Sequence, residues 1–183
     1  PFSDSTKVAT LSNTQIAAGL LTLAGAPGSY LTSGTARSVA VAPAYLARWT
    51  SASSTISTTT DTDVRISVAN DSGTLLPDAV LAGNSAGFTG AISLSGISTT
   101  TYPSLTLIAT LTSSSSAATP SIDSWRIGYD AGPTPLPNVA FTLTGAKTKG
   151  STSGGAAIYK TEVSTSTGST GTSTMSIEWD LYQ

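Results

Sequence analysis

The clearest pattern along the chain is a strict alternation of apolar and polar residues over short runs. In residues 63–69 (DVRISVA), Val64, Ile66 and Val68 alternate with polar side chains. A period of two predicts a β-strand with these three residues on its buried face. The sequence NDSG at 70–73 follows directly and is typical of a hairpin turn.

A second alternating run lies at 121–129 (SIDSWRIGY) and is followed by a proline-rich stretch. The alternation predicts that Trp125, Ile127 and Tyr129 share one buried face of a strand. Three prolines then fall within five residues, in the sequence PTPLP. Proline fixes φ and has no N–H to donate, so we expect a stiff, extended joint at 132–137.

Other β-like runs recur every ~10–15 residues with Gly, Pro, Asn or Ser between them. The run at 15–23 also has the Ala and Leu content of a short helix, although Gly19 favours a strand. Residues 53–62 are nearly all Ser and Thr, and we expect a loop or a solvated edge there. The remaining predicted strands cover residues 8–11, 19–23, 30–42, 46–52, 74–76, 90–94, 104–112, 138–144, 157–163 and 174–183.

This pattern predicts an all-β protein, an antiparallel jelly-roll or immunoglobulin-like β-sandwich with a second, smaller and incomplete β module. The second module holds about three strands, which bury one face at best. The predicted parts are an N-terminal β arm at 1–24, the sandwich at 25–131, the joint at 132–137 and the second module at 138–183.

Composition indicates an exposed β protein rather than an ordinary soluble enzyme. Ser (30) and Thr (32) are abundant in the 183 residues, whereas only 10% of residues are charged. Ordinary soluble domains have about 25% charged residues. Hydroxyl groups have therefore largely replaced charges, and Thr in particular suits a half-solvated pleated surface. We expect an extracellular or cell-surface location.

Several function classes are excluded or disfavoured by the residues that the chain lacks. There is no His and no Cys, which excludes a Ser–His–Asp device and a disulfide framework. The two Glu residues, Glu162 and Glu178, give no paired-carboxylate motif, so we expect no enzyme and no cofactor. A net charge of −2 without a basic cluster predicts no nucleic-acid partner. No apolar run approaches ~20 residues, so we expect no membrane insertion.

Two resemblances to bacterial surface-protein modules appear at these residues. The pattern GSYLTSG…ARWTS…TDVRISVANDSGTLL…SLTLIATLTS…TPSIDSWRIGY, over 28–129, resembles jelly-roll modules of the discoidin or carbohydrate-binding kind. The pattern PNVAFTLTGAKTKG…AIYKTEVST…SIEWDLYQ resembles the start of a transthyretin-like module, the B-type module of collagen adhesins and pilins. The second resemblance covers only the first strands of that fold.

The transthyretin-like resemblance raises the question of an intramolecular isopeptide bond. In that family the reacting Lys lies inside the first strand, whereas the inward positions here are Val139, Phe141 and Leu143. Lys147 and Lys149 follow the strand, in the turn. We therefore expect no isopeptide bond in this chain.

Aromatic residues are the first candidates for a binding site. Tyr30, Tyr45 and Trp49 are candidate glycan contacts, because aromatic faces stack on the C–H groups of sugars. Trp125 belongs to the same group of aromatics. Burial in the core of a sandwich is the competing interpretation and the favoured one for both Trp residues.

Carboxylates give a weaker candidate, a calcium site. Its ligands would come from Asp61, Asp63, Asn70, Asp71 and Asp78. Calcium needs six to eight oxygens, and no DxDxDG loop is present. Turn formation explains the NDSG sequence adequately, so we expect no metal.

The leading hypothesis is a non-enzymatic structural subunit of a pilus- or filament-like assembly. Unfinished sheets expose unpaired N–H and C=O groups and tend to acquire a partner strand. Head-to-tail exchange between copies would give a fibre, a homopolymer of this chain. The alternatives are a carbohydrate-binding adhesion module that contacts surface glycans, and a spacer stalk. The candidate strand-exchange residues are Val8, Leu11, Leu21 and Leu23 in the N-terminal arm, and Ile177, Trp179 and Leu181 near the C-terminus.

Overall fold

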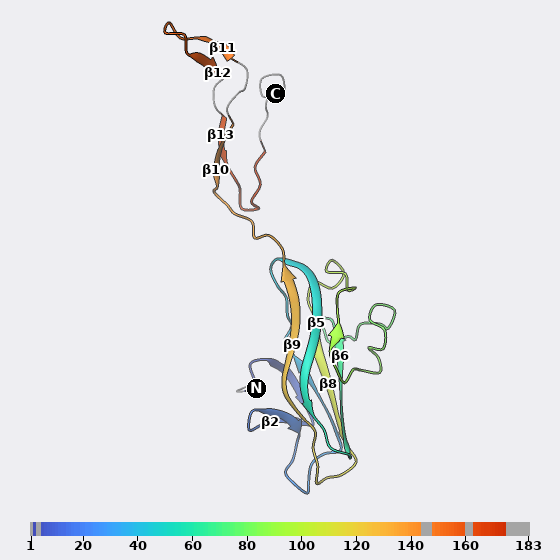
Figure 1. Ribbon diagram of the computed structural model, residues 1–183. Coiled ribbons are helices and arrows are strands. Elements are labelled where there is room, and N and C mark those ends of the chain that lie inside the picture. The colour runs from blue at the N-terminus through green and yellow to red at the C-terminus, as the bar shows by residue number, and fades with distance from the viewer. Residues whose placement is uncertain (1, 3–4, 144–147, 160–162, 175–183) are drawn as a thin grey trace. The chain divides into compact units, whose positions relative to one another are not determined.

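The protein is all-β and divides into two compact units. The computed structural model describes residue 2 and residues 5–143, 148–159 and 163–174, in which it contains thirteen strands. Unit 1 is Pro1–Gly132 and unit 2 is Pro133–Gln183 (Figure 1). The boundary falls at the start of the predicted proline-rich joint.

Within the described residues, no helix is both long enough and apolar enough to cross a bilayer.

Unit 1 is a sandwich of two antiparallel sheets, which confirms the predicted fold class. The first sheet contains, in spatial order, β1 (Val8–Ser12), β4 (Ser33–Ser38), β8 (Thr106–Ser113) and β6 (Thr62–Ala69). The second sheet contains, in spatial order, β2 (Thr14–Ala17), β3 (Leu20–Leu23), β9 (Ser121–Ala131), β5 (Leu46–Ser57) and β7 (Ile92–Ser93).

Successive strands alternate between the two sheets from β3 to β9. The odd-numbered strands of this stretch lie in the second sheet and the even-numbered strands lie in the first. Every connection in this stretch therefore crosses the sandwich, and strands that are neighbours in one sheet lie far apart in the sequence.

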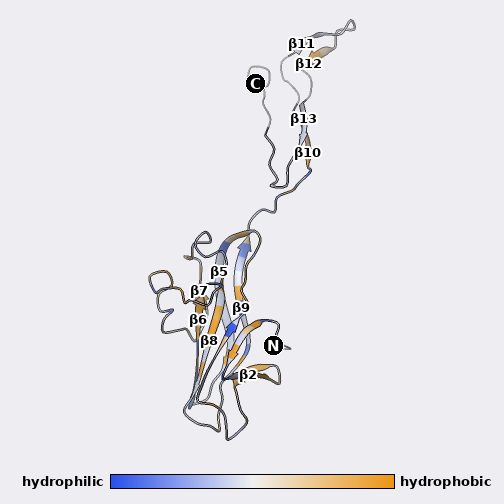
Figure 2. Ribbon diagram, turned by 180° about the vertical axis from the view of Figure 1, so that it is seen from behind, coloured by the Kyte–Doolittle hydropathy of each residue, from blue (hydrophilic) through white to orange (hydrophobic). Residues whose placement is uncertain are grey.

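The core follows the predicted alternation where the alternation is strongest. In β6, Val64, Ile66 and Val68 are at most 1% exposed, as predicted. β6 pairs with β8 along its whole length, and Leu107 and Leu111 of β8 are equally buried. Figure 2 shows these hydrophobic segments within the strands of unit 1.

The N-terminal segment 1–24 contributes three strands to the sandwich. β1 lies in the first sheet and β2 in the second, and the chain passes between them at Asn13, which has a φ of 56°. β2 and β3 form a hairpin whose two loop residues, Ala18 and Gly19, both have positive φ, typical of a type I′ turn. Residues 15–23 are therefore strand and turn, not helix.

The Ser/Thr-rich stretch after residue 53 is more regular than a loop. β5 continues to Ser57, and its last residues pair with the first residues of β9, ending at Ser57 opposite Ser121. The loop alternative is thus wrong for residues 53–57, whereas the solvated-edge alternative fits them: among the described residues they pair with β9 on one side only, because β7 pairs with β5 only at Ser51 and Ala52. The pairing with β9, which lies far away in sequence, imposes the strand on residues that carry little hydrophobic alternation of their own.

The outer edge of β6 is covered by the segment that follows it. The NDSG turn forms as predicted, with the Gly73 N–H donating to the Asn70 carbonyl at 3.0 Å. Farther along, the fully buried Asn84 bonds the backbone of Val68: the Val68 N–H donates to Asn84 Oδ1 at 2.7 Å, and Asn84 Nδ2 donates to the Val68 carbonyl at 2.8 Å. A side-chain amide therefore stands where a neighbouring strand would pair.

The described part of unit 2 forms two small two-stranded sheets. One pairs β10 (Ala140–Leu143) with β13 (Val163–Ser166), and the other pairs β11 (Thr148–Ser151) with β12 (Ala157–Tyr159). Val139 and Phe141, predicted to point inward, are 44% and 36% exposed. The described part of unit 2 therefore gives these side chains little cover.

Candidate functional site: the open edge of β9

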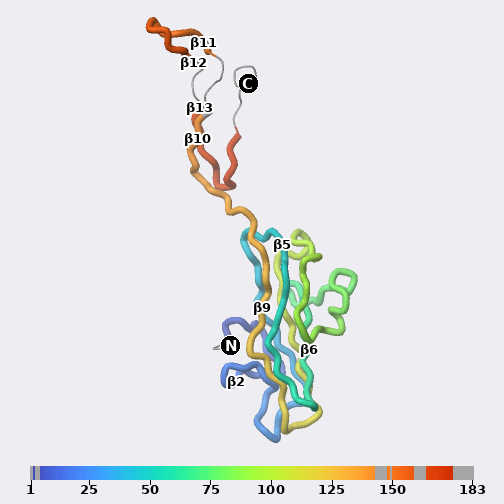
Figure 3. Tube along the Cα trace, viewed as in Figure 1, coloured from blue at the N-terminus to red at the C-terminus, as the bar shows by residue number. Residues whose placement is uncertain are grey.

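In the described part of unit 1, β9 has an unpaired edge over most of its length. On one side this strand pairs with β5 from Ser121 to Ala131 (Figure 3). On the other side β3 pairs with it at two positions, Leu21 opposite Ile122 and Thr22 opposite Ser121. Within the described residues no strand pairs with this side beyond Ile122, so the edge is open over residues 123–131.

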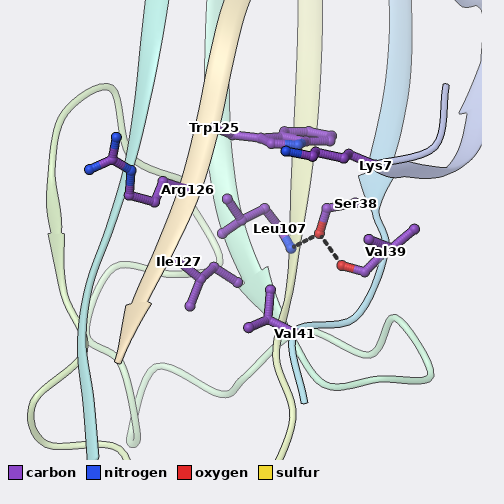
Figure 4. Close-up of a pocket in the computed structure, with 8 residues that line it drawn as sticks. All are labelled: Lys7, Ser38, Val39, Val41, Leu107, Trp125, Arg126 and Ile127. Atoms are coloured by element: carbon purple, nitrogen blue, oxygen red, sulfur yellow. Dashed lines mark hydrogen bonds between the residues drawn. The ribbon is translucent and has the colours of Figure 1, made fainter. Parts of the chain in front are cut away.

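A cavity of about 280 Å³ lies beside this open edge, between the two sheets. Figure 4 shows the side chains that line it. They come from β9, from β8, from β4 and the segment after it, and from the turn before β1: Lys7, Ser38, Val39, Val41, Leu107, Trp125, Arg126 and Ile127.

The walls of the cavity are mainly apolar. Its one hydroxyl, on Ser38, is held within the wall: Ser38 Oγ donates to the Val39 carbonyl at 2.9 Å and accepts from the Leu107 N–H at 2.9 Å. It therefore has little capacity left for a ligand. Val39 remains 39% exposed beside it. The cavity thus offers chiefly an apolar surface to whatever enters.

The predicted buried face of β9 is buried only in part. Trp125 and Ile127 are half-buried and line the cavity, and Tyr129 is 44% exposed. The prediction that this face is buried is therefore wrong for Tyr129. The alternation correctly predicts which side chains share this face. It carries no information on how far β3 extends along β9, and β3 ends before it could cover these residues.

Phe2 covers one end of the exposed face of β9. Its ring meets the Trp125 ring edge to face, with 5.3 Å between centroids, and Phe2 is only 5% exposed. Sequence reasoning missed this contact. The available signal was a single large apolar residue ahead of the polar run at 3–7.

Two cations lie at the cavity without an acidic partner among the described residues. Lys7 and Arg126 both line it. Figure 4 shows Arg126 pointing away from the other lining side chains. The ion pairs formed between described residues use other arginines, Arg48 with Asp130 at 2.6 Å and Arg65 with Asp63 at 2.8 Å.

The predicted glycan-contact aromatics do not form one platform. Trp49 is fully buried and its Nε1 donates to the Tyr102 carbonyl at 2.9 Å, which removes it from the glycan contacts. The Tyr30 N–H donates to Ser116, near the start of β9, whereas Tyr45 accepts from Gly132, just past its end. β9 has eleven residues, so these two tyrosines lie roughly 30 Å apart.

The candidate strand-exchange residues of the N-terminal segment have different environments. Leu21 and Leu23 are fully buried in the core of unit 1. Val8 packs against that core, and Leu11 is 42% exposed on β1. The other candidates, Ile177, Trp179 and Leu181, lie outside the described residues.

The candidate calcium ligands serve turns and ion pairs. Asn70 Oδ1 accepts from the Thr74 N–H at 2.9 Å, and Asp63 pairs with Arg65. Asp78 accepts from the hydroxyl and the N–H of Ser85, and these bonds hold the pKa of its carboxyl below the ordinary value. Among the described residues no group of three or more His, Cys, Asp or Glu side chains lies close enough together to hold a metal ion.

Comparisons of the chain with models of protein families, with curated proteins and with solved structures found no match in any of the three.

Proposed function

We propose that the protein is a non-enzymatic, extracellular structural subunit that assembles into pilus- or filament-like fibres by β-strand addition between copies. The single observation that carries this proposal is the open edge of β9 next to an apolar cavity. An extended strand that binds there gains main-chain hydrogen bonds from the edge and buries alternate side chains in the cavity. An unpaired strand edge beside an apolar cavity therefore has the two features that a strand-accepting site needs.

The finer family assignments belong to the same proposal. Alternation of successive strands between two sheets supports a jelly-roll-like unit 1. The exposed Val139 and Phe141 support an unfinished, transthyretin-like unit 2. Surfaces rich in Ser and Thr with few charges suit an extracellular fibre, in which many copies pack side by side.

Nothing in the described residues favours the sugar-binding alternative. An aromatic platform needs adjacent exposed rings, whereas Tyr30 and Tyr45 lie near opposite ends of β9 and Trp49 is buried. The cavity itself offers few free polar groups to orient the hydroxyls of a sugar.

The proposal is tested by measuring self-association of the full chain. We expect sedimentation velocity to detect species that grow with concentration, and negative-stain microscopy to show fibres. Val39→Asp places a charge at the mouth of the cavity on a side chain that is already 39% exposed, so it should weaken assembly at least tenfold without unfolding the protein.

The matched control is Leu31→Asp, because Leu31 is 44% exposed and lies away from the cavity. This variant should assemble like the wild type. A wild-type chain that stays monomeric up to the millimolar range, or equal losses in both variants, would overturn the proposal.

A further inference from the structure

The open edge of β9 sets requirements for the strand that it accepts. Successive residues of an added strand point to opposite faces of the sheet. One face of that strand would share the side of Trp125 and Ile127 and fill the apolar cavity. The other face would share the side of Arg126, which points away from the cavity (Figure 4). The donor should therefore alternate apolar side chains with acidic ones.

One stretch of this chain meets both requirements. The other strongly alternating runs are used or lack acids: Val64–Val68 and Leu105–Leu111 are buried in the core, and the run at 139–143 carries no acidic residue. Residues 177–181 (IEWDL) place Glu178 and Asp180 between three apolar residues. Its two acids alternate with the apolar residues, as a strand that meets Arg126 on one face and the cavity on the other requires.

The N-terminal arm is a poor donor by comparison. Leu21 and Leu23 are already fully buried in their own sandwich, and Leu21 pairs with Ile122 of β9. Releasing them would expose two core side chains to water, which opposes their use as a donor. A donor at residues 174–183 leaves Leu21 and Leu23 in place.

We infer that the open edge of β9 binds residues 174–183 of a second copy of the chain. This inference rests on the proposed function and names both the donor and the acceptor. Ile177, Trp179 and Leu181 enter the cavity face beside Trp125 and Ile127, while Glu178 or Asp180 pairs with Arg126 on the opposite face. At ~3.3 Å per residue, the five residues 177–181 span ~17 Å, which is shorter than the open edge.

The first test mixes two variants of the full chain. Ile177→Ser/Trp179→Ser/Leu181→Ser removes the donor and leaves the acceptor, whereas Val39→Asp/Ile127→Asp removes the acceptor and leaves the donor. Each variant alone should remain monomeric. An equimolar mixture should form dimers and no longer species, because each dimer has one working contact and no second one to extend it.

The second test uses surface charges, which leaves the folded core intact. Arg126→Glu alone and Glu178→Lys/Asp180→Lys alone should each weaken self-association roughly tenfold, as for a lost charge pair at an interface. The two sets of substitutions combined in one chain should restore most of the affinity. Thermal melts of each variant show whether unit 1 remains folded.

The outcomes separate the two proposals. A monomeric wild type overturns the proposed function and this inference together. If the wild type assembles and the triple-Ser variant assembles equally well, the donor is another segment and only this inference fails. Loss of assembly by the triple-Ser variant without dimers in the mixture, or without rescue by the charge reversal, also overturns it, because residues 174–183 then act within their own copy.

Discussion

Asn84 is a fully buried polar residue whose side chain is hydrogen-bonded to the backbone of two other segments. Its side chain bonds both backbone groups of Val68, and its Nδ2 also donates to the Leu76 carbonyl at 2.7 Å. The residue is fully buried, so water cannot replace these partners. One amide thus satisfies three backbone groups along the outer side of β6 and the segment that follows it.

We predict that Asn84→Ala lowers the free energy of unfolding by about 3 kcal/mol or more, because each orphaned buried group costs about 1–3 kcal/mol. Urea denaturation followed by tryptophan fluorescence gives the value, since the buried Trp49 reports on the core. The control is Asn70→Ala, which removes bonds in an exposed turn and should cost about 1 kcal/mol. Equal losses in the two variants would contradict this account.

For single residues, the sequence predicts which face of a strand is buried better than it predicts individual side-chain contacts. The buried positions Val64, Ile66 and Val68 follow from their alternation alone. Asn84 lies in a stretch (AGNSAG) that reads only as a loop, and nothing local indicates that its amide replaces a strand. Such a role depends on which backbone groups another segment leaves unpaired.

Among the elements, β4 packs closely against the passage from β1 to β2. Gly34 of β4 lies against this passage: a Cβ there would meet the Asn13 carbonyl oxygen at 2.5 Å and Thr14 Cγ2 at 2.8 Å. Thr14 Oγ1 also donates to the Thr35 carbonyl at 3.0 Å. β4 can therefore lie under the passage only with a glycine at position 34.

Gly34→Ala should lower the free energy of unfolding by about 1–3 kcal/mol, because the added methyl group must push backbone atoms aside. Gly90→Ala is the control, since a Cβ at Gly90 meets nothing within 4 Å. Chemical denaturation of both variants gives the comparison. A Gly34→Ala variant as stable as Gly90→Ala would show that the passage relaxes at little cost.

Most strands of unit 1 were predictable from the sequence, whereas β11, at 148–151 in the predicted turn of unit 2, was not, and neither were strand ends and neighbours. The strand at 121–129 was expected, but the short pairing of β3 with β9 was not, and that pairing creates the candidate site. The sequence also left the extension of β5 to Ser57 open between a loop and a solvated edge, for a related reason. Both features depend on partners that are distant in the sequence, about which local patterns carry no information.

The two units of the molecule differ in how much they bury. Unit 1 contains a core with many fully buried leucine, isoleucine and valine side chains. No residue of unit 2 whose side chain is described is buried, and Ile158 is 45% exposed. Isolated two-stranded hairpins are marginally stable in water. The described strands of unit 2 should therefore open far more readily than those of unit 1.

Hydrogen exchange should report this difference directly. Below the concentration at which copies associate, we expect the amides of β10 and β12 to exchange roughly a hundredfold or more faster than those of β8 and of the paired side of β9. Mass spectrometry of peptic fragments from the full chain resolves these segments. Comparable protection in β10 and β8 would mean that unit 2 has a core supplied by residues outside the described ranges.

The long pairing of β5 with β9 has a mechanical consequence. The chain leaves unit 1 at Gly132, directly after β9, so tension on the joint reaches the sandwich through this strand. Antiparallel hydrogen bonds lie perpendicular to their strands. A pull along β9 therefore acts at a right angle to its hydrogen bonds with β5, which run from Ser121 to Ala131. In this shear geometry all the bonds between the two strands bear the force together. They do not break one pair after another.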